Sequence, residues 1–405
     1  MRIRSFQGLR PASNAVEQVI SLPYDVVSTE EARDLAANNP SSMLRVVRAE
    51  IEFPTGQDPY ADEVYAKAVA NFRRLQDEGK LVRESEPCIF LYRQQMGDHS
   101  QTGIMAVSHV DDYDRGKIKR HERTRVAKEN DRTRLTREMR ANAGPVFLTF
   151  RDDARVQSLI DGHTQGETLY DLTAPDGIRH TVWRVAGGEE FVEAFKSVPA
   201  TYVADGHHRA ASAARVAREL REENPGHNGE EDFNWFLTVL FPASELKILA
   251  YNRLVADLNG LSPEEFLENV GEIADVRPDA GDTPEEPRKI RFYVGGKWYG
   301  IRLEPEAGAD PVTSLDVSQL QEKILHPLLG IDDPRTNDRI DFVGGIRGTE
   351  FLKKKVDSGE AGVAFSLYPV LVEQLMDIAD AGQIMPPKST WFEPKLRSGF
   401  FIHTF

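Results

Sequence analysis

The chain has 405 residues, of which 40% are hydrophobic, so it can bury a substantial core, and its length predicts two or three domains. Its formal net charge of -15 argues against a general nucleic-acid-binding protein, because neutralising phosphates requires a concentrated basic face. The lone cysteine, Cys88, excludes an internal disulfide framework and a cysteine-rich zinc site. The first residues lack the apolar core of a signal peptide, and no stretch is apolar enough to cross a bilayer, so we expect a cytoplasmic protein without membrane partners.

The N-terminal part of the chain is predicted to mix helices and antiparallel strands. Capping residues, helical spacing of apolar residues and alternating apolar runs predict helices over 31–37 and 60–77 and strands over 88–94 and 104–110. Before the first helix lies the turn sequence Pro-Tyr-Asp. Tyr24 and Asp25 are therefore candidates for ligand contact, and a purely structural turn explains them equally well.

Residues 111–140 form the most charged stretch of the chain, and the default interpretation is solvated helices carrying ion pairs. One cluster differs from this default because it follows a strand and offers an acid, a base and hydrogen-bond donors together: His121, Glu122, Arg123 and Thr124. Glu122 could accept the proton of a substrate hydroxyl, His121 could share a proton or contact phosphate, and Thr124 could bind phosphate or metal.

The central stretch, 201–220, is predicted to be a buried strand followed by an Ala-rich helix. Five residues form the turn between them, Asp205, Gly206, His207, His208 and Arg209. A strand that feeds a helix in this way points free backbone N–H groups outward, which favours an anion. Gly206 allows close backbone approach, Arg209 can fork onto phosphate oxygens, and Asp205 can hold Mg²⁺ or orient a histidine. The alternative is an N-capping Asp205 with two surface histidines.

The remaining elements predict a mixed α/β, or α+β, fold with a second, C-terminal α/β unit. Periodicity and turn residues predict strands over 146–150, 169–172, 180–185, 235–241, 247–254, 289–294 and 298–303, a helix over 314–328, a strand–helix–strand unit over 339–367, and a helix over 370–379. The strand 247–254 carries Asn252 and Arg253. Arg253 could clamp a phosphate or a carboxylate, or form an ion pair on an edge strand.

The C-terminal residues contain a proline-stiffened loop over 384–396, followed by a predicted strand over 400–405. The loop presents Lys388, Ser389, Thr390 and Lys395, whose side chains suit phosphate, although the glycine-rich approach of a P-loop is absent. The alternative is a tail that only packs over the core.

Motifs spread along the chain resemble a bacterial family of conserved domains of unknown function. They are PYDVV at 23–27, HERT at 121–124, DGHHR at 205–209, YNR at 251–253, PPKST at 386–390 and FEPK at 392–395. The DGHHR turn with its Ala-rich helix also resembles the ParB/sulfiredoxin-like superfamily, in which the equivalent turn holds nucleotide phosphates, and it is similar to that of archaeal-type free serine kinases. The resemblance implies a ParB-like core with insertions over 1–258. A helix-start signal at 261–263 predicts a second, α/β unit over 259–380, and a tail over 381–405 is expected to return to the core.

The same resemblance implies a Mg²⁺-dependent kinase that transfers a phosphoryl group from ATP or ADP to free L-serine. Glu122, Asp205, His207 and His208 are then the catalytic candidates, with Asp205 also the metal ligand and the fallback base. Phosphate contacts are expected from His121, Thr124, Gly206, Arg209, Lys388, Ser389 and Thr390, and substrate contacts from Tyr24, Asp25, Asn252, Arg253 and Lys395. Serine and a nucleotide are the expected partners, with a homodimer as a further option.

Two other functions are compatible with the sequence. One is a nucleotide-binding regulatory module of the ParB type, without kinase turnover. The other is a metal-dependent phosphohydrolase with Zn²⁺ or Mn²⁺ among His121, His207, His208 and Asp205, which ranks lowest because the side chains of adjacent histidines diverge.

Overall fold

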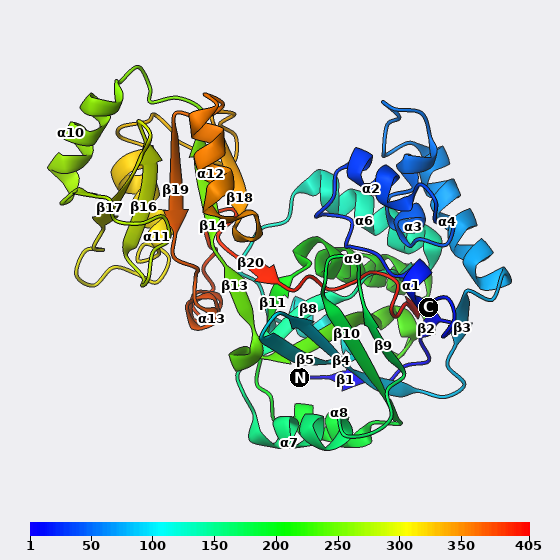
Figure 1. Ribbon diagram of the computed structural model, residues 1–405. Coiled ribbons are helices and arrows are strands. Elements are labelled where there is room, and N and C mark those ends of the chain that lie inside the picture. Colours follow the sequence, from blue (N-terminus) through cyan, green and yellow to red (C-terminus); the bar gives the residue numbers. More distant parts are fainter. The chain divides into compact units, whose positions relative to one another are not determined.

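The computed structural model describes residues 1–405 and divides into two compact units (Figure 1). Unit 1 consists of Met1–Leu246 together with Pro394–Phe405, and unit 2 is Lys247–Glu393. The domain boundaries expected from the sequence, after residues 258 and 380, differ from the limits of unit 2. None of the helices combines the length and the apolar composition that crossing a membrane requires.

Unit 1 is built on a nine-stranded mixed sheet with the order β6-β11-β8-β12-β5-β4-β10-β9, and β1 pairs with β5 beside this path. Its strands are β1 (Ile3–Arg4), β4 (Cys88–Met96), β5 (His99–His109), β6 (Ile118–Lys119), β8 (Val146–Phe150), β9 (Tyr170–Thr173), β10 (Arg179–Ala186), β11 (Thr201–Asp205) and β12 (Trp235–Pro242). The pairs β6–β11 and β8–β12 are parallel, and the other neighbours are antiparallel. The expected mixed α/β fold is therefore confirmed.

The two faces of this sheet are covered differently. One face packs against α5 (Val110–Asp114), α7 (Ala154–His163), α8 (Glu189–Phe195) and α9 (His207–Glu223) in a single apolar cluster. Figure 1 shows α7 and α8 side by side. On the opposite face, Phe401 packs on Phe90 and Phe400 packs on Tyr92. The last residues of the chain thus form part of the core of unit 1.

A helical layer of unit 1 has its own apolar cluster. It contains α1 (Val16–Val19), α2 (Thr29–Ala36), α3 (Leu44–Val47), α4 (Asp62–Asp77) and α6 (Val126–Met139). The capping residues expected before α2 form a capping box between Ser28 and Glu31. Two short ribbons, β2 (Leu9–Pro11) with β3 (Leu81–Arg83) and β7 (Ala141–Asn142) with β21 (His403–Thr404), complete the unit.

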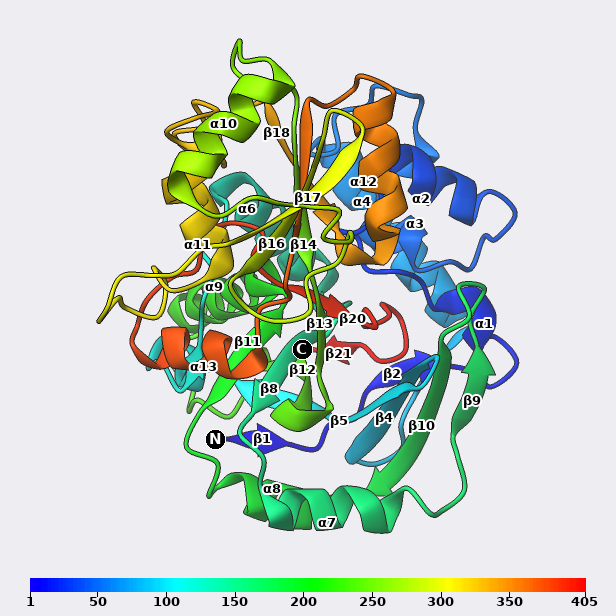
Figure 2. The same ribbon diagram turned by 60° about the vertical axis from the view of Figure 1, so that its left-hand side comes forward.

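Unit 2 is built on a six-stranded antiparallel sheet with the order β15-β17-β16-β19-β14-β18. The elements of this unit are β13 (Lys247–Leu249), β14 (Tyr251–Val255), α10 (Pro263–Ile273), β15 (Arg277–Pro278), β16 (Lys289–Val294), β17 (Lys297–Arg302), α11 (Asp316–Leu320), β18 (Ile340–Gly344), α12 (Gly348–Asp357), β19 (Val363–Leu367), α13 (Val372–Asp380) and β20 (Trp391–Glu393). Helix α12 packs along the sheet in both views (Figures 1 and 2).

Four predicted elements differ from the structure. The strand over 247–254 is interrupted at Ala250 and belongs to two sheets, as β13 and β14. The helix over 314–328 continues beyond α11 as a π-helical segment, Gln321–Leu325. The strands β18 and β19 both pair with β14, so the strand–helix–strand unit has another strand between its two strands. The final strand is wrong over most of 400–405, because only His403–Thr404 forms a ladder.

Candidate functional site

The parallel pairing of β6 with β11 brings the two chemical motifs of unit 1 together. Thr201 lies beside Ile118 and Tyr202 beside Lys119, so both strands run in the same direction at the edge of the sheet. The chain therefore leaves β6 into 120–125 at the same end of the sheet where it leaves β11 into Gly206 and α9. We call the meeting point of 121–125 with 205–209 the junction site.

Gly206 makes the sharp turn from β11 into α9. Its φ of 94° is in the left-handed region, and a Cβ at this position would lie 3.0 Å from Arg209 Nε. Gly206 is the N-cap of α9, and no side chain caps the helix. The N-capping alternative for Asp205 is therefore wrong, and the 17-residue helix presents the positive end of its dipole at the junction site.

Three groups of unit 1 surround the Asp205 carboxylate: one backbone N–H and two cationic side chains. Its Oδ1 accepts a hydrogen bond from the Gly206 N–H at 2.8 Å, and its Oδ2 accepts one from Lys395 Nζ at 3.2 Å. Arg209 Nη2 lies 3.9 Å from the same Oδ2. Burial alone would raise the pKa of Asp205, but the charges of Lys395 and Arg209 hold it well below its ordinary value. Asp205 is therefore ionised at neutral pH, with its side chain 25% exposed.

His121, Glu122 and His207 form a compact cluster beside Asp205. The two imidazole rings are perpendicular, with centroids 4.5 Å apart, and both residues are at least 95% buried. Burial lowers the pKa of His121 to about 4, and burial is also the main reason that the pKa of His207 lies well below 6.5. Both rings are therefore neutral at pH 7. Glu122 is exposed, and its Oε2 lies 3.9 Å from His207 Nδ1.

The same three residues have the geometry of a candidate metal site. One ligand atom from each lies within 4.8 Å of the others. His121 Nδ1 and His207 Nε2 are buried and make no hydrogen bond. Neutral imidazole and carboxylate are ligands for Zn²⁺ and Mn²⁺. The metal-site alternative thus has a cluster here, but this cluster contains Glu122 in place of His208 and Asp205.

His208 positions the loop that carries Glu122. Its Nε2 accepts a hydrogen bond from the backbone N–H of Arg125 at 3.0 Å, and burial lowers its pKa, which keeps this nitrogen free of a proton. The Thr124 hydroxyl donates to Glu129 Oε2 at 2.6 Å, and this hydrogen bond fixes the loop to the first turn of α6. His208 and Thr124 thus define the conformation of 121–125.

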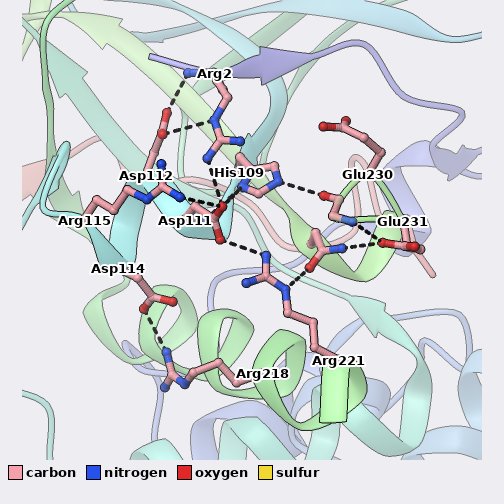
Figure 3. A network of polar contacts seen from close by, with 12 residues as sticks. Arg2, His109, Asp111, Asp112, Asp114, Arg115, Arg218, Arg221, Glu230 and Glu231 are labelled. Atoms are coloured by element: carbon pink, nitrogen blue, oxygen red, sulfur yellow. Dashed lines mark hydrogen bonds and ion pairs between the residues drawn. The ribbon is translucent and has the colours of Figure 1, made fainter. Parts of the chain in front are cut away.

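The far half of α9 is fixed to the segment that follows β5, as Figure 3 shows. Arg221 donates to Asp111 Oδ1 at 2.8 Å, and Arg218 donates to Asp114 Oδ1 at 2.8 Å. Asp111 also lies 3.4 Å from a guanidinium nitrogen of Arg2. Because α9 follows β11 directly at one end and is tied to α5 at the other, the Asp205–Arg209 turn is held on a rigid support.

Asp25 and Tyr24 approach the junction site from the N-terminal loop. Asp25 Oδ2 lies 3.9 Å from Arg209 Nη2, so Arg209 lies between two carboxylates. Tyr24 is buried beneath the Arg132 guanidinium, which lies 4.1 Å from the ring centroid. Tyr24 and Arg209 line a cavity of about 40 Å³, which is too small for a nucleotide.

The other candidate residues belong to unit 2. Asn252 Oδ1 accepts a hydrogen bond from the Leu367 N–H at 3.1 Å, and the Ser389 hydroxyl donates to Pro386 O at 2.7 Å. The Lys388 ammonium lies 5.6 Å from the centre of the Tyr251 ring. These contacts lie within unit 2, as do those of Arg253, and Thr390 lies beside Ser389 in the same loop. A role for these residues in a phosphate or substrate site stays a prediction.

Several supporting contacts were not anticipated. Gln94 Nε2 donates to Lys395 O at 2.9 Å, Pro145 O accepts from Arg209 Nη1, and Arg125 donates to His208. All three join segments more than 60 residues apart. No local sequence pattern encodes such contacts. The only signal is weak: the hydrophobic run around Gln94 indicates that this residue lies on a strand.

Solved structures similar to this chain have low identity and low TM-scores. A variant of free serine kinase in complex with AMP is 14% identical, with a TM-score of 0.37, over 71% of this chain and 87% of that chain. SbnI with a C-terminal truncation, from Staphylococcus aureus, is 13% identical, with a TM-score of 0.39, over 73% and 85%. A conserved hypothetical protein from Pyrococcus furiosus is 13% identical, with a TM-score of 0.34, over 73% and 93%.

Among curated proteins no sequence matches the chain. One protein-family profile matches residues 3–318, which include the HERT, DGHHR and YNR motifs. The match covers well over half of the chain. It confirms the expectation that the motifs belong to a family of conserved domains of unknown function. The chain belongs to the DUF1015 family, whose description is "protein of unknown function".

Proposed function

We propose that the protein is a small-molecule kinase that transfers a phosphoryl group from ATP or ADP to the hydroxyl of free L-serine in the cytoplasm. The observation that carries the proposal is the surroundings of Asp205. An ionised carboxylate lies between Lys395 and the uncapped N-terminus of α9, next to a second, exposed carboxylate on Glu122. Serine as the acceptor is taken from the resemblance of the DGHHR turn to free serine kinases.

The residues of the junction site fit a nucleotide phosphate and Mg²⁺. Asp205 is ionised and partly exposed, as a Mg²⁺ ligand must be, and Mg²⁺ sites commonly use one or two carboxylates together with phosphate oxygens. The N–H groups of the first turn of α9 and the Arg209 guanidinium are donors for phosphate oxygens. Mg²⁺, when bound, neutralises charge that develops on the phosphoryl oxygens.

Glu122 is the proposed base. It accepts the proton of the serine hydroxyl as the serine oxygen forms a bond to the terminal phosphorus and the bond from that phosphorus to the bridging oxygen breaks. The products are O-phosphoserine and ADP from ATP, or AMP from ADP. Asp205 is a poorer base than Glu122 because Lys395 and Arg209 stabilise its ionised form. Neutral His207 adds no charge beside the Glu122 carboxylate that would oppose proton uptake.

Nucleotide turnover with and without L-serine tests the proposal. Chromatographic separation of ATP, ADP and AMP should show nucleotide consumption that requires L-serine. The variant Glu122→Gln should lose at least about 100-fold in kcat, since general-base catalysis contributes about 10²–10⁴. The control is Glu138→Gln, which alters a surface carboxylate on α6 that pairs with Arg134. Serine-independent turnover, or equal activity of the two variants, contradicts the proposal.

A second candidate function is a metal-dependent phosphohydrolase, and the unpartnered nitrogens of His121 and His207 favour it. In this case the metal would be held by His121, His207 and Glu122, and phosphate release would be independent of serine. Elemental analysis of the purified protein distinguishes the two. Stoichiometric Zn²⁺ or Mn²⁺ that is lost in His121→Gln supports the hydrolase, whereas its absence supports the kinase.

A further inference from the structure

Unit 2 contains a cavity of about 390 Å³ that lies among α11, the π-helical segment Gln321–Leu325, β18 and the loop at 386–387. Most of its wall is apolar, including Val317, Leu325 and Phe342. Two charged side chains, Arg253 and Glu322, also line it. Small-molecule sites in proteins commonly have volumes of about 300–1,000 Å³, apolar walls and few polar groups. The cavity has these properties.

Arg253 is the unusual feature of this cavity. The residue lies on β14, an inner strand of the sheet, and is only 4% exposed. Its guanidinium donates to Tyr251 O and, at 3.4 Å, to Pro387 O, and it lies 5.0 Å from the centre of the Phe342 ring. No carboxylate lies within ion-pair distance of it, and burial lowers its pKa to about 10.

A buried guanidinium without a carboxylate is costly, because a charge removed from water needs a partner to offset the lost hydration. Two carbonyl oxygens and a ring face offset part of this cost but leave the positive charge without a counter-ion. Glu322 lines the same cavity and does not pair with Arg253. An anion that enters the cavity would supply the missing counter-ion.

We propose that this cavity of unit 2 binds a small carboxylate with an apolar body, such as an apolar amino acid or its deaminated acid. The ligand carboxylate pairs with Arg253, and its body lies against Val317, Leu325 and Phe342. At about 30 Å³ per water, the volume holds about 13 waters, which corresponds to a ligand of about ten non-hydrogen atoms. This site is independent of the proposed kinase function.

Isothermal titration calorimetry on the full chain tests the proposal with four probes. They are 3-phenylpropanoate, its uncharged amide, L-phenylalanine and L-serine. The acid or the amino acid should bind, while the amide and serine should bind at least tenfold more weakly. Comparison of 3-phenylpropanoate with L-phenylalanine distinguishes a deaminated acid from an amino acid. Equal binding of acid and amide, preference for serine, or no carboxylate binding overturns the proposal.

Two variants and one control show whether the ligand occupies this cavity. Arg253→Met should weaken carboxylate binding at least tenfold, whereas Arg347→Met, which alters an exposed arginine near the Phe351 ring, should leave it unchanged. If Arg253→Met does not fold by circular dichroism, Val312→Trp fills the cavity while Arg253 is retained, and it should also abolish binding. Wild-type affinity in either folded cavity variant overturns the proposal.

Discussion

Replacing Lys395 with methionine removes the ammonium group that lies 3.2 Å from Asp205 Oδ2. At this distance two unit charges attract by about 5 kcal/mol at an effective dielectric constant of 20 and by about 1.3 kcal/mol in water. Both side chains are partly exposed, and Arg209 remains 3.9 Å from the same oxygen. We therefore expect Lys395→Met to lower the free energy of unfolding by about 1–3 kcal/mol at pH 7, between the values for exposed and buried pairs.

The pH dependence of this loss identifies its cause. A carboxyl group whose folded pKa is depressed stabilises the fold above its unfolded pKa of about 3.9, and the contribution is lost as pH falls through the folded pKa. In the variant the carboxyl is protonated at a higher pH than in the wild type. The difference between the two proteins should therefore hold between pH 7 and 4 and narrow as pH falls below about 4.

Urea denaturation followed by tryptophan fluorescence at several pH values measures the difference, and Lys395→Arg, which keeps the charge, is the control. In the background of Asp205→Asn, Lys395→Met should cost less than in the wild type, as a double-mutant cycle requires for a direct interaction. A loss that does not narrow below about pH 4, or that is equal in both backgrounds, would refute the electrostatic reasoning.

Three further predictions concern the turn and its histidines. Gly206→Ala should lower the free energy of unfolding, measured by urea denaturation, by about 1–3 kcal/mol, because the backbone of Gly206 is in the left-handed region and a Cβ would crowd Arg209. Burial keeps His121 neutral with a pKa of about 4, whereas in the unfolded chain it takes up a proton near pH 6.5. The free energy of unfolding of the wild type should therefore fall by up to about 3 kcal/mol between pH 6.5 and 4, and His121→Gln should show a smaller fall by urea denaturation. His208→Ala removes the acceptor of the Arg125 N–H, so kcat should fall about tenfold while nucleotide affinity by calorimetry stays unchanged.

The sequence predicted the local parts of the junction site well. The buried strand and the Ala-rich helix were expected over 201–220, and they form β11 and α9. Gly206 was expected to let the backbone approach a ligand closely, which stays a prediction, and the structure gives this residue a positive φ. These features could be predicted because periodicity and turn chemistry act over a few residues.

The parts that depend on pairing between distant segments could not be predicted. The two-residue strand β6 has almost no signal of its own, yet its parallel register with β11 places His121 beside His207. The sequence also left open whether Arg253 forms an ion pair on an edge strand. That alternative is wrong, because β14 lies inside the sheet and Arg253 pairs with no carboxylate. Strand order and counter-ions are set by tertiary packing, which a single sequence does not encode locally.

Phosphorus-31 NMR of the purified protein with Mg²⁺, nucleotide and L-serine tests the central claim most directly, because it observes the new bond. We predict a phosphomonoester resonance that coincides with added O-phosphoserine, grows only when L-serine is present, and is absent in Glu122→Gln. Hydrolysis of the nucleotide to inorganic phosphate at the same rate with and without L-serine, and no phosphomonoester resonance, would contradict it.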